Sequence, residues 1–209
     1  EYSAGREVVV KASGEALGKG VVVPTDKDEA IRAAKAMLID RSLGDAGQLI
    51  VVEERLVGRE VSLIALCNGL DYLVLPSSKD YKAAFDGGLG PNTGGMGAIS
   101  PSPDVEEEEF KSWAEKFIRP ILDFFAEAGN RYIGTLYAGL ILTEEGPKAL
   151  EFNARFGDPE TQAIMPRING DLGEILYLAA EGKPMPSLEV GPECSATIVL
   201  SARGYPGKY

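Results

Sequence analysis

The segment LEFNARFGDPE gathers oxygen-bearing and cationic side chains that could do chemistry. Glu151 and Asn153 alternate along a strand-like run, so both side chains face one way and offer oxygens suited to a hard cation such as Mg²⁺. A satisfied polar pair on a strand is the alternative interpretation of these two residues. Arg155, Asp158 and Glu160 follow directly, which places a phosphate-pairing guanidinium and further carboxylates beside the predicted metal site.

Two lysines near the start of the chain indicate a site for a polyanion. Lys11 lies in the strand-like run VVVKA and Lys19 in the glycine turn ALGKG, across one predicted hairpin. Their ammonium groups can converge on a nucleotide triphosphate, while two solvated lysines are the alternative. The spacing of a Walker motif is absent, so a P-loop protein is not supported. Gly20 and its neighbours suit a mobile loop that covers phosphates instead.

Two further segments add candidate ligand groups. The run VVEERL can present backbone groups to an adenine, and Glu60 after it can accept hydrogen bonds from ribose hydroxyls. The loop GPNTGGMG offers small residues and consecutive N–H groups able to wrap a carboxylate or a phosphate. Asp80 and Lys82 lie shortly before this loop. Neither segment identifies a ligand by itself.

Composition excludes several classes of function. The chain has no histidine, which removes Ser/His and Cys/His triads and imidazole bases. A formal net charge of -11 without clusters of Lys and Arg argues against a nucleic-acid partner. Cys67 and Cys194 lie in apolar runs without zinc spacing, so both are expected to be buried, reduced thiols. No stretch is long and apolar enough to span a membrane, no signal peptide is visible, and a cytoplasmic protein is expected.

Residue patterns predict the elements that must position these side chains. A hairpin formed by EVVVKAS and VVV precedes a helix through AIRAAKAML, which Thr25 would cap, with Asp28 three positions later. QLIVVEERL is predicted as a strand. VSLIALC and DYLVLP form two antiparallel strands joined by a tight turn at Asn68 and Gly69.

The second half of the chain begins with a long segment rich in Gly and Pro. Residues 77–103 cannot hold regular structure over their whole length and are predicted to form a functional loop. A helix from Asp104 to near Gly129 precedes two strands joined by a turn at Gly146. Helices around Gln162 and over residues 171–181, with a last strand CSATIVLS, complete an α+β architecture with two lobes.

Taken together and in order, several segments resemble the family of phosphoribosylamine–glycine ligases, in the ATP-grasp superfamily. They are VVVKAS, GKGVVV, IVVEERLVGREVS, KDYK, GPNTGGMGA, LYAGLIL and EFNARFGDPETQ. The resemblance implies an ATP-grasp fold, with two lobes of largely antiparallel sheet and packed helices. It assigns 1–56 to the small lobe that covers the nucleotide, 57–190 to the large lobe with metal and substrate sites, and 191–209 to the start of a truncated C-terminal domain. Flanking N- and C-terminal domains are therefore expected.

The resemblance also implies roles for particular residues. Those expected to bind ATP are Lys11, Lys19 and Gly20 at the phosphates, Glu53, Glu54 and Leu56 along the adenine, and Glu60 at the ribose. Those expected to face the substrates 5-phosphoribosylamine and glycine are Asp80, Lys82, Asn92, Thr93, Gly94, Gly95, Met96 and Gly97. Glu151 and Asn153 would hold Mg²⁺ or Mn²⁺, and Arg155 and Asp158 would be catalytic, near the transferring phosphate.

The activity implied by the resemblance is ATP-dependent ligation of glycine to 5-phosphoribosylamine in de novo purine biosynthesis. It proceeds through a glycyl phosphate and gives glycinamide ribonucleotide, ADP and phosphate. Such chemistry needs no imidazole and no protein nucleophile, in agreement with the missing histidines. An isolated ATP-binding fragment without turnover is one alternative, because domains outside this chain would help to build the acceptor site. Another ATP-grasp ligase or carboxylase is the second.

Two positions depart from the family pattern. Tyr81 stands where many relatives have histidine, which leaves substrate contacts open at that position. Glu15 puts an acid in the loop expected to cover phosphates, and nucleotide binding is open there.

Overall fold

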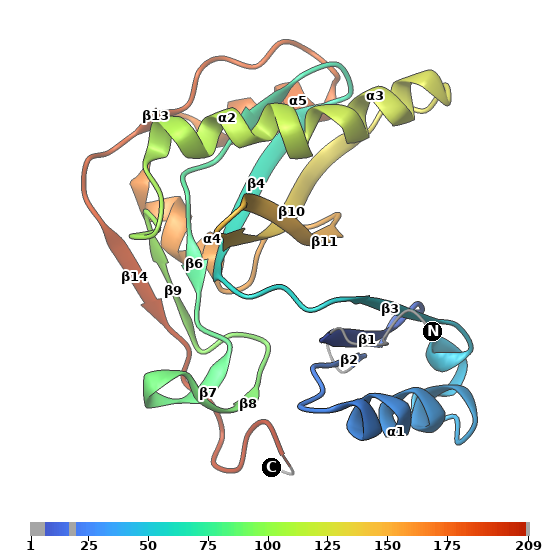
Figure 1. Cartoon of the computed structure of the whole chain (residues 1–209). Coiled ribbons are helices and arrows are strands. Elements are labelled where there is room, and N and C mark those ends of the chain that lie inside the picture. Colours follow the sequence, from blue (N-terminus) through green and yellow to red (C-terminus); the bar gives the residue numbers. More distant parts are fainter. Residues whose placement is uncertain (1–6, 17–19, 208–209) are drawn as a thin grey trace. The chain divides into compact units, whose positions relative to one another are not determined.

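The computed structural model describes residues 7–16 and 20–207 (Figure 1). The chain divides into two compact units, Glu1–Val57 and Gly58–Tyr209. The predicted domain limits at 56/57 and 190/191 stay predictions.

The first unit is an antiparallel sheet covered on one face by a helix. Its strand order is β2–β1–β3, with β1 Val8–Ala12, β2 Val21–Val22 and β3 Ile50–Glu54. Val8 and Val10 alternate with Val9 and Lys11 along β1, and the two former valines are buried. They pack with Ala30 and Met37 of α1 (Lys27–Leu38), and a short 3-10 helix, η1 (Gly44–Gly47), follows. The predicted hairpin and strand are confirmed.

Helix α1 begins one residue later than a Thr25 cap requires. The N-cap is Asp26, whose carboxylate accepts a hydrogen bond from the N–H of Glu29 at 2.7 Å. Glu29 in turn accepts hydrogen bonds from the N–H and the hydroxyl of Thr25, both at 2.7 Å. The prediction of a Thr25 cap was wrong because an aspartate follows and serves the free amides of the first turn directly.

A four-stranded antiparallel sheet forms the centre of the second unit. Its order is β11–β10–β4–β5, with β4 Arg59–Asn68, β5 Tyr72–Val74, β10 Ile133–Thr143 and β11 Gly146–Asn153. Residues 61–68 of β4 are all buried, so this strand is covered on both faces. The predicted strand pairs around Asn68–Gly69 and Gly146 are confirmed.

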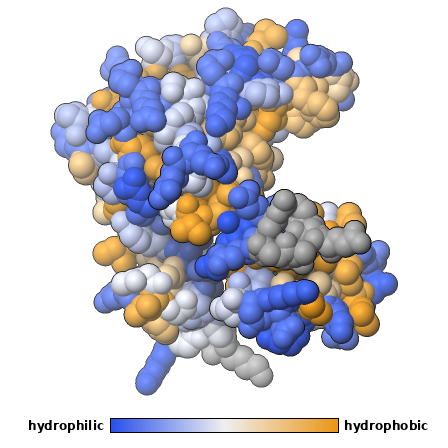
Figure 2. Space-filling view, in the orientation of Figure 1, coloured by the Kyte–Doolittle hydropathy of each residue, from blue (hydrophilic) through white to orange (hydrophobic). Residues whose placement is uncertain are grey.

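Helices cover both faces of this sheet. On one face, α2 (Glu107–Phe117) and α3 (Arg119–Glu127) run across β4 and β10 (Figure 1). Hydrophilic residues cover much of the outer surface of α2 (Figure 2). On the other face, α4 (Glu160–Ile164) and α5 (Leu172–Ala180) pack on apolar residues of β4 and β10.

The single helix predicted between Asp104 and Gly129 is two helices. Pro120 lies at the start of α3 and has no N–H to donate, which favours a new helix start at this point over continuation of α2. Ile118 lies at the junction and is fully buried in the core beneath α2 and α3.

The segment 77–103, predicted to lack regular structure over its length, contains several short strands. These are β6 Lys79–Asp80, β7 Ala83–Phe85, β8 Leu89–Asn92 and β9 Gly97–Ser100, with a 3-10 turn η2 at Asp86–Gly88. The strand predicted in CSATIVLS is β14 (Ser195–Ile198), and it completes a sheet of order β14–β9–β6. The prediction failed because strands of two to four residues are too short to leave a periodic pattern in a glycine-rich segment.

Smaller elements complete the unit. A 3-10 turn, η3 (Met165–Arg167), leads to β12 (Ile168–Asn169), which pairs with β13 (Glu189–Val190). Cys67 is buried as predicted, and burial raises the pKa of its thiol to about 12. Cys194 is exposed, because it precedes β14 outside the core, so that prediction was wrong. Among the described residues, no helix has the length and apolar character to cross a membrane.

Candidate active site

Polar side chains of neighbouring strands form a row on one face of the central sheet. Cross-strand register places Ser62 of β4 opposite Gly139 of β10, and Gly139 opposite Glu151 of β11. In antiparallel sheet, directly opposed residues share a face. Glu60 and Asn153 lie at alternate positions from members of this row and face the same side.

A second strand segment adds to this face. Ser62 forms an isolated antiparallel bridge with Ser78, and the N–H of Ser62 donates to the carbonyl of Ser78 at 3.0 Å. Asp80 and Lys82 follow at alternate positions and therefore project to the same side. The fold thus brings together residues predicted separately for ribose, substrate and metal.

Lys82 lies between two carboxylates. Its ammonium is 2.8 Å from Glu60 Oε2 and 3.7 Å from Asp80 Oδ2. Burial alone would lower the pKa of Lys82, but Asp80, Glu60 and Glu151 outweigh burial and raise it to about 12. Lys82 therefore keeps its positive charge at neutral pH.

Asp80 is a carboxyl group of this cluster whose pKa is strongly raised. Its side chain is 6% exposed, and burial raises its pKa to about 6. Lys82 opposes this rise, while the nearby carboxylates of Glu160 and Glu60 add to it. The cluster holds more negative than positive charge, which suits a cationic or amine-bearing ligand.

Glu160 lies beneath the cluster. It is only 2% exposed, and its Oε1 is 2.8 Å from both Ser62 Oγ and Tyr137 OH. Sequence reasoning placed Glu160 beside the metal and passed over Ser62 and Tyr137. The available signal was a serine within the otherwise apolar strand VSLIAL, at an alternate position from Glu60.

Residues 157–160, the GDPE segment, pack closely around the Glu160 carboxylate. A Cβ on Gly157 would lie 2.7 Å from Glu160 Oε2, so a larger residue would displace the carboxylate. Burial and the neighbouring charge of Glu160 raise the pKa of the Tyr137 hydroxyl, which therefore stays protonated and donates. Glu160 thus ties the start of α4 to strands β4 and β10.

Glu151 and Asn153 fit a hard cation by their donor atoms. Glu151 is exposed, and Asn153 Nδ2 lies 3.4 Å from Glu151 Oε1, so the side chains share a face as predicted. Gly139 opposite allows this placement, because a Cβ there would lie 3.2 Å from Glu151 Cγ. Within residues 7–16 and 20–207, no group of three or more acidic, Cys or His side chains forms a metal cage. A cation here would therefore need further oxygens from phosphates or water, as Mg²⁺ usually takes.

The two predicted catalytic residues, Arg155 and Asp158, both precede Glu160 in sequence and are exposed. The guanidinium of Arg155 lies 5.9 Å from the centre of the Tyr137 ring and donates to the carbonyl of Phe156 at 2.9 Å. Asp158 accepts a hydrogen bond from Gln162 Nε2 at 2.9 Å. The catalytic roles of both side chains stay predictions.

The loop 92–97 is folded onto Tyr81 and Lys82. The N–H of Thr93 donates to the carbonyl of Lys82, and that of Met96 donates to the carbonyl of Tyr81, both at 2.7 Å. The N–H of Gly95 donates to Thr93 Oγ1 at 3.0 Å. These amides, expected to wrap an anion, are used within the chain in this structure. Their bonding holds the predicted substrate residues together, from Asn92 at the end of β8 to Gly97 at the start of β9.

Gly95 explains why this loop and the GDPE segment occur together. Its φ of +126° is open to glycine alone, and a Cβ would lie 2.3 Å from Pro159 Cδ. The loop therefore packs directly against the residue between Asp158 and Glu160.

In the first unit, two of the predicted nucleotide residues, Lys11 and Glu53, lie on the sheet face opposite α1. Lys11 forms an ion pair with Glu53 at 2.5 Å. Glu54 lies on the other face of β3 because successive residues alternate, and Leu56 follows the strand, half-buried. Gly20 is buried, and its carbonyl accepts from the N–H of Ala12 at 2.7 Å. Lys19 lies outside the described residues.

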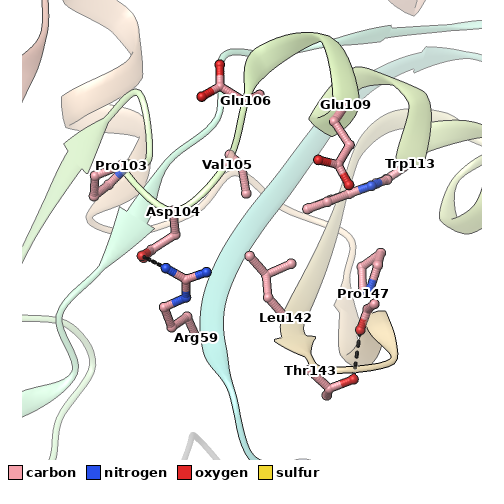
Figure 3. Close-up of a pocket in the computed structure, with 11 residues that line it drawn as sticks. Arg59, Pro103, Asp104, Val105, Glu106, Glu109, Trp113, Leu142, Thr143 and Pro147 are labelled. Carbon is pink, nitrogen blue, oxygen red and sulfur yellow. Dashed lines mark hydrogen bonds and ion pairs between the residues drawn. The ribbon is translucent and has the colours of Figure 1, made fainter.

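A cavity of about 320 Å³ lies on the other face of the central sheet (Figure 3). Arg59 and Asp104, which form an ion pair at 3.0 Å, line it together with Trp113 and Leu142. None of the predicted site residues lines this cavity, so it is separate from the polar face that carries Glu60, Lys82 and Glu151.

The fold and the site define the class of this protein: the chain is an ATP-grasp domain. It belongs to the family described as phosphoribosylglycinamide synthetase, ATP-grasp (A) domain, which matches residues 2–161. A phosphoribosylamine–glycine ligase of Streptococcus suis is 45% identical over 205 residues, covering 98% of this chain and 49% of the relative. The chain thus spans about half the length of the curated relatives it matches.

Solved structures agree with this assignment. The crystal structure of phosphoribosylamine–glycine ligase from Thermotoga maritima matches with a TM-score of 0.88 and 34% identity, over 96% of this chain and 50% of that one. A biotin carboxylase–beta-gamma-ATP complex from Campylobacter jejuni matches with a TM-score of 0.66 and 16% identity, over 90% of this chain and 41% of that one. The second likeness concerns the fold alone.

Proposed function

We propose that this chain carries the nucleotide, metal and substrate groups of a phosphoribosylamine–glycine ligase. The reaction would join glycine to 5-phosphoribosylamine at the expense of ATP, giving glycinamide ribonucleotide, ADP and phosphate. The observation that supports it best is the shared sheet face of Glu60, Asp80, Lys82 and Glu151, which offers cationic and anionic groups side by side. A cytoplasmic location and flanking N- and C-terminal domains are part of the proposal.

The chemistry would proceed in two steps. A carboxylate oxygen of glycine attacks the γ-phosphorus of ATP, and the bond to the β-phosphate oxygen breaks, giving glycyl phosphate and ADP. The amine of phosphoribosylamine then attacks the carbonyl carbon, phosphate leaves, and the amine loses a proton. Phosphoryl transfer of this kind depends on positioning and charge neutralisation.

The residues of this chain would divide these tasks. Glu151 and Asn153 would hold Mg²⁺ or Mn²⁺, which supplies charge neutralisation at the phosphates when bound. Lys11 would pair with phosphate oxygens, and Glu60 would accept from the ribose hydroxyls. Lys82 would fix an anionic group of the substrate and Asp80 its amine, since opposite charges attract over this short range.

A fragment that binds ATP without turnover is a second candidate. The observation that favours it is that the chain spans about half of its curated relatives. An acceptor site that also needs residues outside this chain would leave nucleotide binding intact and turnover absent. The two candidates differ in phosphate release and agree in nucleotide binding.

The test measures phosphate release from Mg·ATP by the intact chain, with glycine and phosphoribosylamine present together or singly. Release that needs both substrates, and falls at least about 100-fold in Glu151→Ala, supports the ligase, because loss of a ligand costs more than loss of an outer-shell partner. Glu127→Ala removes an exposed carboxylate at the end of α3 and serves as control. ATP binding without phosphate release would favour the binding fragment. Absence of both ATP binding and phosphate release would contradict both candidates.

A further inference from the structure

A tyrosine from the C-terminal part of the chain contacts the predicted substrate loop. The hydroxyl oxygen of Tyr205 accepts a hydrogen bond from the N–H of Gly94 at 3.1 Å, across 111 positions of sequence. The neighbouring amides of Thr93, Gly95 and Met96 find their acceptors within the stretch 81–93. Among the amides of residues 93–96, that of Gly94 is therefore the one whose hydrogen-bond acceptor is a side chain distant in sequence.

The loop needs an external contact at this position. Gly94 and Gly95 form a pair of residues without side chains, which can adopt many backbone conformations. Gly95 is fixed by its packing against Pro159, and Met96 accepts at its carbonyl from the N–H of Val199 at 2.9 Å. The orientation of the peptide at Gly94 lacks such packing, since a Cβ there would lie 3.5 Å from the Tyr205 hydroxyl, in ordinary contact.

Tyr205 is itself held in a compact turn. Its N–H donates to the carbonyl of Ala202 at 3.1 Å, and the N–H of Gly207 donates to that of Gly204 at 2.8 Å. The strand β14 that leads to this turn pairs with β9 directly after the loop, from Gly97 opposite Ile198. The turn and the loop are thus anchored to the same small sheet.

We propose that Tyr205 is a positioning residue that fixes the Gly94 peptide, and with it the loop 93–96, for the phosphoribosyl substrate. The proposal rests on the proposed function, since that function gives the loop its ligand. A loop with one defined peptide orientation binds more tightly than one that must be ordered by the ligand. The hydroxyl group, more than the ring, carries this role.

The first measurement is amide hydrogen exchange at Gly94 in the full chain and in Tyr205→Phe. Loss of a neutral hydrogen bond changes a local equilibrium by about fivefold. We expect exchange at Gly94 to accelerate about fivefold or more, with little change in Tyr132→Phe. That control loses a comparable hydroxyl bond, to the carbonyl of Thr135 at 2.7 Å, beside the core under α2 and α3. Unchanged exchange at Gly94 would overturn the proposal.

The second measurement is equilibrium binding of ribose 5-phosphate and of Mg·ADP, which needs no turnover. Tyr205→Phe should weaken ribose 5-phosphate binding about fivefold and leave Mg·ADP binding unchanged. Equal or tighter ribose 5-phosphate binding in the variant, or none by the unaltered chain, would overturn the substrate role. If the ligase assay shows no activity but Tyr205→Phe still weakens ribose 5-phosphate binding, the result counts against the proposed function and not against this inference.

Discussion

At the residue scale, the buried carboxylate of Glu160 should make a measurable contribution to stability through Tyr137. Tyr137→Phe removes the hydroxyl that donates to Glu160 at 2.8 Å and leaves the ring in place. A buried acceptor that loses a donor costs about 1–3 kcal/mol, and Ser62 retains one bond, so we expect a loss of about 1–2 kcal/mol. Urea denaturation measures it. A variant as stable as the parent chain would show that this network carries no free energy.

Asp80 predicts a dependence of stability on pH. Its pKa is about 6 in the folded chain, above the ordinary value of 3.8 for an aspartate, so the folded state binds the proton more tightly. Stability is therefore lost as pH rises from about 4 to about 6. Asp80→Asn removes this loss and should be more stable than the parent at pH 7, by about 2 kcal/mol or less, and no more stable at pH 4.

The control for Asp80 is Asp86→Asn, a change at an exposed aspartate in the turn after β7. Unfolding midpoints of the three proteins at pH 4 and pH 7 decide the matter. A gain for Asp80→Asn that is equal at both pH values would contradict the raised pKa.

At the element scale, the N-cap of α1 is expected to matter more than the other acid beside it. Asp26→Ala removes the acceptor for the Glu29 amide and should cost about 1 kcal/mol. Asp28→Ala, in the same first turn, should cost only a few tenths of a kcal/mol because it removes a charge near the helix dipole. Thermal unfolding of both variants provides the comparison. Equal losses would contradict Asp26 as the cap.

The contact between the glycine loop and the GDPE segment gives a second prediction at this scale. Gly95→Ala places a methyl group against Pro159, in a backbone conformation with φ of +126°. Gly129→Ala has the strained φ of +74° but no atom within 4 Å of the new methyl group. We expect about 1 kcal/mol lost at Gly129 and at least about 3 kcal/mol at Gly95, measured by urea denaturation. Similar losses of stability in the two variants would mean that the loop 92–97 moves away from Pro159 without a cost in free energy.

Elements with a strong period could be predicted from the sequence, and the others could not. The strand pairs that meet at Gly146 and at Asn68–Gly69 follow from alternation and turn residues. Pro120 could be seen in the sequence as a residue that can break a helix. The acidic and apolar residues on both sides of it nevertheless favoured one long helix. The short strands of residues 77–103 have two to four residues each, too few to show a period, and β9 also pairs with β14, which is distant in sequence.

The site follows the same distinction. Glu151 and Asn153 could be paired from their spacing, because two positions along a strand fix a shared face. The position of Glu160 beneath that face could not be predicted, since it depends on the packing of α4 against β4 and β10. Tyr205 was missed because its partner, Gly94, is 111 positions away.

At the scale of the whole molecule, the proposed function is that of a ligase domain that neutralises and positions charge and uses no protein nucleophile. In the proposed reaction, glycine's carboxylate attacks the γ-phosphate of ATP. This step fixes the fate of one oxygen atom, because the oxygen that forms the new bond to phosphorus leaves with phosphate when the amine attacks.

The most direct measurement is turnover of glycine labelled with ¹⁸O in both carboxylate oxygens, with mass analysis of the released phosphate. We expect one labelled oxygen in each phosphate, and labelled phosphate only when phosphoribosylamine is present. Phosphate that carries no label, or that takes its oxygen from labelled water, would contradict it and show that the chain hydrolyses ATP.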